Sequence, residues 1–166
     1  MILLLCALTI IPQIIHSQEN TYPTPERLFY IARSLNKNLV CYDANIVNGK
    51  LKNKDPLNVY WVNREENPGK TNELSYIQRK MAYGYKLISQ GDDTCEVTLS
   101  AYPGRKLTIC KQDSKYVCLV TINNQTAILQ YLYVKAKPNN PLSVEYVELH
   151  GIIPGTQKTI SERIMK

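Results

Sequence analysis

Hydrophobic and polar residues alternate along most of this chain, in short runs separated by turn-forming residues. Such alternation places every second side chain on one face and is typical of half-buried β-strands. Asn48-Gly49 predicts a tight hairpin. Tyr102-Pro103-Gly104 predicts a three-residue hairpin loop that pairs Val97 with Ile109. The predicted strands span residues 27–34, 38–47, 57–63, 85–89, 95–102, 105–111, 116–123, 127–137, 143–151 and 158–164.

One stretch, ELSYIQRKMAYGYK at residues 73–86, breaks this alternation. Leu74, Ile77 and Met81 recur at the spacing of one helix face. We therefore predict an α-helix over about 72–83, with this apolar stripe docked on the sheet.

Nine or ten strands with hairpin links and one helix indicate a mainly β protein. The hairpin links predict an antiparallel meander. We expect this sheet to close into a barrel-like or strongly curved form, because closure protects its unpaired edges. A β-sandwich is the alternative. Residues 18–166 contain no internal repeat and have the length of a single domain, so we interpret them as one β-rich domain.

The first seventeen residues, MILLLCALTIIPQIIHS, are almost entirely apolar and end abruptly before Gln18. This run is short for a membrane-spanning helix and contains Pro12. Ser17 is the kind of small residue at which signal peptidase cuts. We interpret residues 1–17 as a signal peptide, with a retained anchor as the alternative, and expect a periplasmic or extracellular protein without a transmembrane segment after signal removal.

The net charge is +6, but the basic residues are spread along the chain and match no nucleic-acid-binding motif. We therefore expect no nucleic-acid partner. A basic exported protein is attracted to anionic polymers of the cell envelope. The expected partners are such a polymer or a small molecule, and the protein is expected to be a monomer.

Four cysteines follow the signal peptide, namely Cys41, Cys95, Cys110 and Cys118. An even count in an exported chain permits two disulfides, whose pairing the sequence leaves open. Three of the four lie among strand-forming apolar residues, so buried free thiols are the alternative. Alternation places Cys110 and Cys118 on opposite faces, which argues against a bridge between them.

The chain lacks an obvious catalytic constellation. His150 is the one histidine after residue 17, and no nucleophile motif accompanies it. The cysteine spacing does not fit a zinc site. We expect no catalytic residue, no metal and no cofactor, and the interpretation favours a protein that is not an enzyme. The alternative is a hydrolase with a minimal acidic site around Asp43, Glu65 or His150.

Tyrosine is the anomaly in composition, with twelve tyrosines against one phenylalanine and one tryptophan. Tyrosine suits both half-buried strand positions and the walls of ligand sites. Tyr30, Tyr42 and Tyr60 lie on successive predicted strands. Tyr131 and Tyr133 share a face of a later strand. These side chains either form a ligand-binding wall or pack in the core.

The helix supplies the remaining candidates. Arg79 carries a planar guanidinium that can bind a carboxylate or stack on a ring. It is expected to bind either a ligand or an internal partner, Asp43, Glu65 or Glu66. The predicted ligand-binding residues are Tyr60, Trp61, Tyr76, Arg79, Tyr83 and Asp43.

Three blocks, YIARSLNKNLVCYDANI (30–46), KDPLNVYWVNREE (54–66) and ELSYIQRKMAYGYK (73–86), together resemble an uncharacterised bacterial exported family, the domain of unknown function 4833. A fourth block is VEYVELHG (144–151). The resemblance covers nearly the whole of residues 18–166. It implies export and a shared fold, and it supplies no activity, ligand or catalytic residue.

The leading hypothesis is a non-enzymatic exported protein that binds a small ligand or an envelope polymer in a tyrosine-lined barrel mouth or groove. A structural or protein-interaction module of the envelope is the alternative from another class, beside the hydrolase named above.

Overall fold

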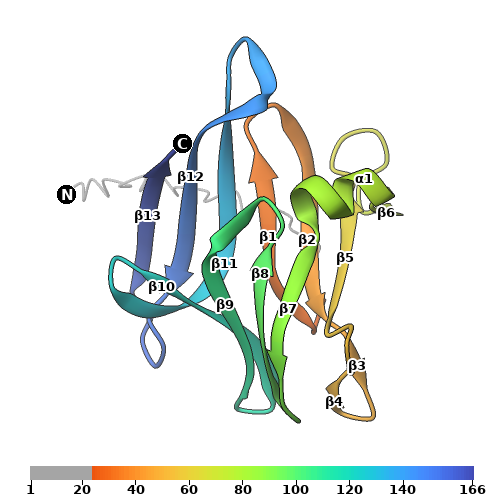
Figure 1. Ribbon diagram of the computed structural model, residues 1–166, viewed down its shortest axis with the longest axis vertical. Coiled ribbons are helices and arrows are strands. Elements are labelled where there is room, and N and C mark those ends of the chain that lie inside the picture. Colours follow the sequence, from red (N-terminus) through yellow and green to blue (C-terminus); the bar gives the residue numbers. More distant parts are fainter. Residues whose placement is uncertain (1–23) are drawn as a thin grey trace, which may run out of the picture.

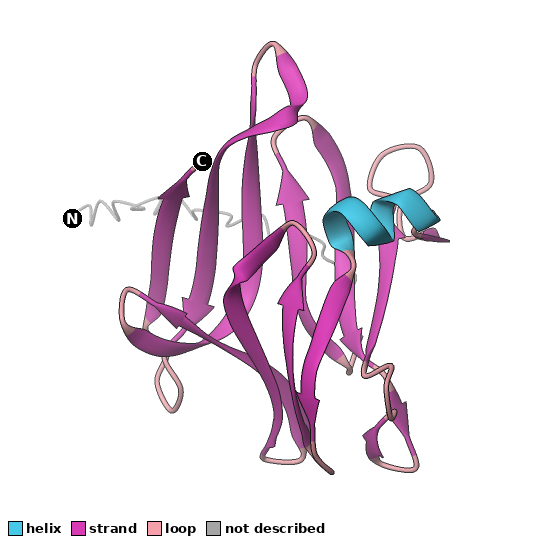
Figure 2. Ribbon diagram, viewed as in Figure 1, coloured by secondary structure: helices cyan, strands magenta, loops and turns pink. Residues whose placement is uncertain are grey.

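The computed structural model of the protein describes residues 24–166 (Figure 1). The predicted signal peptide, residues 1–17, lies outside the described residues. Strands dominate, with one short helix beside them (Figure 2). The strands are β1 (Arg27–Arg33), β2 (Asn36–Ala44), β3 (Ile46–Val47), β4 (Lys50–Leu51), β5 (Leu57–Val62), β6 (Thr71–Glu73), β7 (Tyr85–Gln90), β8 (Thr94–Leu99), β9 (Tyr102–Gln112), β10 (Lys115–Ile122), β11 (Gln125–Lys137), β12 (Asn140–Ile152) and β13 (Thr159–Met165).

Eleven of these strands form one sheet, and β3 and β4 form a separate hairpin. The main path runs β6-β5-β2-β1-β11-β10-β9-β8-β7, and β12 and β13 continue from the other edge of β11. All neighbours are antiparallel except β1 and β11, where Tyr30 pairs with Tyr131 in a parallel register. The strand-rich class and curved sheet are confirmed, but the sheet is mixed and not a purely antiparallel meander.

β11 is the branch point of the sheet. The β11 residues that pair with β12 include Ile128, which also pairs with β10, and residues 131–134, which also pair with β1, so β10 and β1 must share the opposite edge. Two arms diverge from that edge: the β1 arm (β1, β2, β5, β6) and the β10 arm (β10, β9, β8, β7). In the view of Figure 1 the two arms overlap, one in front of the other.

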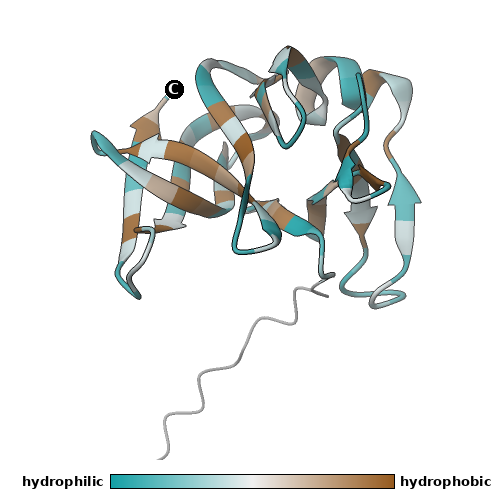
Figure 3. Cartoon of the chain, turned by 90° about the horizontal axis from the view of Figure 1, so that it is seen from below, coloured by the Kyte–Doolittle hydropathy of each residue, from teal (hydrophilic) through white to brown (hydrophobic). Residues whose placement is uncertain are grey.

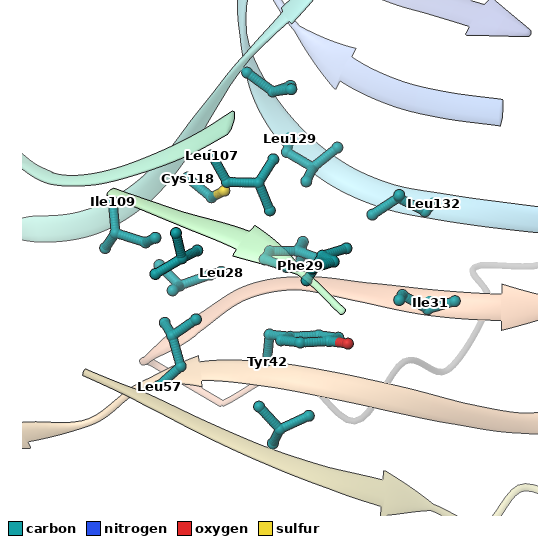
Figure 4. Close-up of a cluster of buried hydrophobic side chains, with 14 of the residues drawn as sticks. Leu28, Phe29, Ile31, Tyr42, Leu57, Leu107, Ile109, Cys118, Leu129 and Leu132 are labelled. Carbon is teal, nitrogen blue, oxygen red and sulfur yellow. The ribbon is translucent and has the colours of Figure 1, made fainter. Parts of the chain in front are cut away.

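The main core fills the space between the arms. Phe29 and Tyr42 from the β1 arm stack with ring centroids 4.3 Å apart, and Leu107 and Ile109 from the β10 arm belong to the same buried cluster (Figure 4). Each fully buried aliphatic or aromatic side chain contributes about 1.5–3 kcal/mol. Seen from below in Figure 3, hydrophobic positions recur along the strands of both arms.

The hairpins only partly follow the predictions. Asn48 (φ 53°) and Gly49 (φ 77°) form the predicted tight turn, here between β3 and β4. The prediction of a three-residue loop at 102–104 was wrong, because Leu99 pairs with Tyr102 and the turn is at residues 100–101. A register shift between Thr98 and Leu99 then places Val97 opposite Leu107 and not opposite Ile109. The register differs by two residues, so each side chain keeps its predicted face.

The helix differs most from its prediction. It comprises an α-turn, α1 (Tyr76–Gln78), and a π-turn, η1 (Arg79–Tyr83), and therefore begins later than the predicted 72–83. Ser75 caps the first turn in a reciprocal capping box with Gln78. The helix ends at Gly84, which has an extended backbone (φ −69°, ψ 177°) and donates its N–H to the Arg79 carbonyl oxygen.

The predicted docking stripe was wrong. Leu74 is buried, but Ile77 and Met81 are 70% and 69% exposed. Leu74 precedes the capped turn, and the π-turn changes the spacing of the residues after it, so Tyr83 is the helical residue that is buried. The helix therefore meets the core at its C-terminal end, through Tyr83, while Leu74 is buried just before the helix begins.

Among residues 24–166, no helix has the length and apolar character needed to cross a bilayer.

Candidate functional site

A stack of three aromatic rings lies on the outer face of the sheet, away from the main core. Tyr30 of β1 pairs with Tyr131 of β11, and Tyr131 pairs with His150 of β12. The Tyr30 and Tyr131 rings are 5.2 Å apart and nearly parallel at 9°. The Tyr131 and His150 rings are 4.3 Å apart at 12°. Neighbouring strands thus hold three rings in one row across the sheet.

Two open hollows flank this row and share all three rings. One has a volume of about 680 Å³ and extends toward Tyr133, Glu148 and the residues after β5. The other has a volume of about 570 Å³ and extends over β12 and β13 toward Ser161. Together they form a groove across the outer face, which we call the aromatic groove. Its floor is the row of Tyr30, Tyr131 and His150.

Charged side chains border the aromatic groove. Glu148 accepts hydrogen bonds from Arg163 at 2.8 Å, and its second oxygen lies 3.7 Å from His150 Nε2. Lys37 forms an exposed ion pair with Glu65. Arg64 also lines the groove, and its guanidinium forms no ion pair within residues 24–166. The cation best placed to meet an incoming anion is therefore Arg64.

A buried polar cluster lies beside the groove on the same face of β1, β2 and β5. The Asp43 carboxylate accepts hydrogen bonds from Thr24, at 3.0 Å, and from Arg27 and the Tyr60 hydroxyl. Arg27 also donates to the Tyr60 hydroxyl at 3.1 Å. Burial, followed by the hydrogen bond to Asp43, raises the pKa of Tyr60 to about 12. Through these three donors Asp43 connects β2 to β1 and β5.

The six site residues predicted from the sequence lie at three separate places. Tyr60 and Asp43 form the buried cluster just described. Trp61 and Tyr83 meet edge to face on the core side, with ring centroids 5.1 Å apart. Tyr76 and Arg79 border a shallow hollow beside the helix.

Arg79 does not reach its predicted internal partners. Its side chain is exposed. Asp43 is bound to Arg27, and Glu65 to Lys37. Arg79 acts on Asp55, whose pKa is lowered mainly by a hydrogen bond from Lys52 and least by the charge of Arg79. Within residues 24–166, Arg79 thus forms no ion pair with Asp43, Glu65 or Glu66.

The tyrosines that were predicted to form either a ligand-binding wall or part of the core are divided between the two faces of the sheet. Tyr30 and Tyr60 do share the outer face, on either side of Cys41, and Tyr131 and Tyr133 share it too. Tyr42 points the other way, into the core. The sequence did not predict a contact between His150 and the tyrosines, and only the pairing of β12 with β11 places its ring on Tyr131.

The family model described as Domain of unknown function (DUF4833) matches residues 29–163, which is most of the chain and includes the four blocks that suggested the resemblance. The chain belongs to the DUF4833 family. No curated protein and no solved structure matches it.

In this DUF4833 chain the four cysteines of residues 24–166 are free thiols. Cys95 and Cys118 lie opposite Ile109 on its two sides, so an intervening strand separates them. Cys110 points to the other face, as alternation predicted. Burial raises the pKa of Cys41 and of Cys95 to about 11. Such thiols are poor nucleophiles near neutral pH.

No group of three or more His, Cys, Asp or Glu side chains in the described part of this DUF4833 chain is arranged to hold a metal ion. Glu65 and His150 border the same aromatic groove, whereas Asp43 lies outside it. What the groove offers is ring edges, tyrosine hydroxyls, an imidazole and a guanidinium. These groups suit the binding of a polar ligand.

Proposed function

We propose that the protein is an exported binding protein whose aromatic groove takes an extended, hydroxyl-rich polymer with anionic groups, of the acidic glycan class found in cell envelopes. The observation that carries this proposal is the row of Tyr30, Tyr131 and His150, with a hollow on each side of it. Because both hollows share the same floor, a ligand that fills both must be longer than either.

The chemistry of the lining supports a polar ligand. Tyrosine and histidine present ring edges and polar tips, which offer hydrogen-bond donors and acceptors to hydroxyl groups. Arg64 adds a cation at the border that can bind a carboxylate or sulfate. The net charge of +6 attracts an anionic polymer over longer range.

The proposal is tested by affinity electrophoresis, in which a polysaccharide cast into a native gel retards a protein that binds it. Acidic polysaccharides, polygalacturonate and alginate, should retard the protein, and neutral dextran should retard it less. Tyr131→Ala removes the central ring and should weaken binding at least ten-fold. Arg64→Gln should reduce the preference for the acidic polymers while retaining part of the binding.

Tyr76→Ala is the matched control, because Tyr76 is 76% exposed on the helix and lies away from the aromatic groove. Retardation of Tyr76→Ala should equal that of the unmodified protein. If Tyr76→Ala or Arg79→Ala weakens binding and Tyr131→Ala does not, the site predicted on the helix is correct and the aromatic groove is not. Absence of retardation by every polysaccharide refutes the proposal.

A different observation supports a second candidate, a protein-interaction module. Tyr76, Ile77 and Met81 expose large apolar side chains on one short helix, and apolar patches on a surface mark interaction sites. The partner to test first is a second copy of the chain. Light scattering after size exclusion should then show a concentration-dependent dimer that Ile77→Lys abolishes, and a monomer at all concentrations removes this candidate.

A further inference from the structure

A second hollow, distinct from the aromatic groove, opens between the two arms of the sheet on the core side. Its volume is about 380 Å³, within the range of small-molecule sites. Both arms, β12 and the end of the helix contribute to its walls. The apolar side chains of the walls include Ile31, Ala82, Leu99, Leu132, Val134 and Val147. We call it the inter-arm pocket.

Two cations stand among these apolar walls, and none of the described residues that line the pocket is acidic. Arg33 donates a hydrogen bond to the Tyr83 hydroxyl at 3.1 Å, which holds the guanidinium at this place. The Lys166 ammonium lies 4.3 Å from the centre of the Tyr102 ring, in a cation–π contact. The described lining of this apolar pocket thus contributes two basic side chains and no acidic one.

The lip of the pocket is also apolar. Leu142, which lies near the start of β12, is 91% exposed and borders the pocket. An exposed leucine beside an apolar hollow lengthens the surface that an alkyl chain can contact as it enters. Apolar walls, an apolar lip and two cations are complementary to a molecule with an alkyl chain and one anionic end.

From this complementarity we infer that the inter-arm pocket binds a single-chain fatty carboxylate of medium length, with its alkyl chain between the arms and its carboxylate at Arg33 and Lys166. Burial of the alkyl chain supplies affinity that grows with each methylene. The two cations select a carboxylate over an alcohol of the same length, because hydrogen bonds to charged groups are stronger than neutral ones. This inference does not depend on the proposed function of the aromatic groove.

Trp61 provides the measurement. It is the single tryptophan of the chain, and its ring contacts Tyr83, which lines the inter-arm pocket. Titration of the full chain with decanoate, kept below micelle formation, should change the tryptophan fluorescence and saturate. Octanoate, which is two methylenes shorter, should bind about 16-fold more weakly, since each buried methylene is worth about four-fold. The affinity for decanol should be lower than the affinity for decanoate by a factor of about ten or more.

Variants locate the binding. Val134→Phe, which narrows the pocket, should abolish saturation by decanoate while the protein keeps its circular dichroism spectrum. Lys166→Gln should weaken decanoate about ten-fold and leave decanol unchanged. It is preferred to Arg33→Gln because Arg33 also lines the aromatic groove. Lys158→Gln, an exposed lysine in the turn between β12 and β13, is the matched control and should leave both affinities unchanged.

Three results would overturn the inference: no saturable response to decanoate, equal affinity for decanoate and decanol, or binding that survives Val134→Phe in a folded protein. Binding to phosphatidylglycerol vesicles without binding to free decanoate would also overturn it, in favour of a membrane surface. Tyr131→Ala should retain decanoate binding, so failure of the aromatic groove and failure of the inter-arm pocket are separable.

Discussion

Replacement of Asp43 by asparagine should destabilise the protein more than any exposed charge change. Asp43 accepts hydrogen bonds from Thr24, Arg27 and Tyr60, and the Arg27 and Asp43 side chains are only 11% and 10% exposed. Asparagine keeps the shape but removes the negative charge opposite Arg27. It also replaces one acceptor oxygen with an NH₂ group that must face the donors of Arg27 or Tyr60.

The magnitude follows from this burial. Breaking a buried ion pair by neutralising one partner costs about 3–5 kcal/mol, because the other charge remains in a poorly solvated site. A domain of this size has a total stability of about 5–15 kcal/mol, so Asp43→Asn should remain folded but have much less margin. Each kcal/mol corresponds to about 2–4 °C at the midpoint in a domain of this size, which gives a decrease of about 6–20 °C.

The assay is urea unfolding followed by Trp61 fluorescence, with the free energy of unfolding extrapolated to water. Glu65→Gln is the matched control, because the Lys37–Glu65 pair has side chains that are 74% and 54% exposed. Its cost should stay below about 1 kcal/mol. The double variant Arg27→Met/Asp43→Leu should recover part of the loss, since it leaves neither charge of the pair buried. If Asp43→Asn costs no more than Glu65→Gln, this reasoning is refuted.

Three further outcomes are expected. Gly84→Ala should lower the thermal midpoint by several degrees, because an added Cβ would lie 2.1 Å from the Arg79 carbonyl oxygen; an unchanged midpoint would show that the π-turn relaxes freely. At pH 8, the half-buried Cys110 should react first with Ellman's reagent, and the other three described cysteines, which are buried, should react only after denaturation. An intact mass lowered by two or four hydrogens would instead reveal disulfides. Hydrogen bonds from Arg105 lower the pKa of Glu162, so this carboxylate stabilises the fold above its unfolded pKa of about 4.3 and loses that effect as the pH falls through its lower folded pKa. Glu162→Gln should therefore cost about 1–2 kcal/mol at pH 7 and little at pH 2, and a constant cost across this range would contradict the assignment.

Part of the candidate site could be judged from the sequence and part could not. Tyr60 and Trp61 are consecutive in a strand, so alternation alone places them on opposite faces of the sheet. The sequence was therefore sufficient to show that these two side chains do not line one site. The aromatic groove depends instead on Tyr30 meeting Tyr131, about a hundred residues later, through the parallel β1–β11 pair. No local pattern specifies that pairing, since both strands read as ordinary alternating segments.

The helix shows the same limit on a shorter scale. Its end at Gly84 could be predicted, because glycine ends helices and here allows a close approach to the Arg79 carbonyl oxygen. Its buried face could not, because the stripe of Leu74, Ile77 and Met81 assumed a continuous α-helix. The capping box at Ser75 and the π-turn after it divide that stripe, and burial of Tyr83 replaces it.

The sequence by itself determined where the long strands lie, which residues share a face within each of them, and which family the chain resembles, but it missed the short strands β4 and β6. These properties depend on the two-residue period of a strand and on local turn chemistry, which any window of the chain contains. The tertiary structure alone decided which strands become neighbours, and so created the branch at β11, the aromatic groove and the inter-arm pocket. Backbone hydrogen bonds do not depend on which side chains the strands carry, so the choice of neighbour depends on which faces bury together when the whole chain is folded.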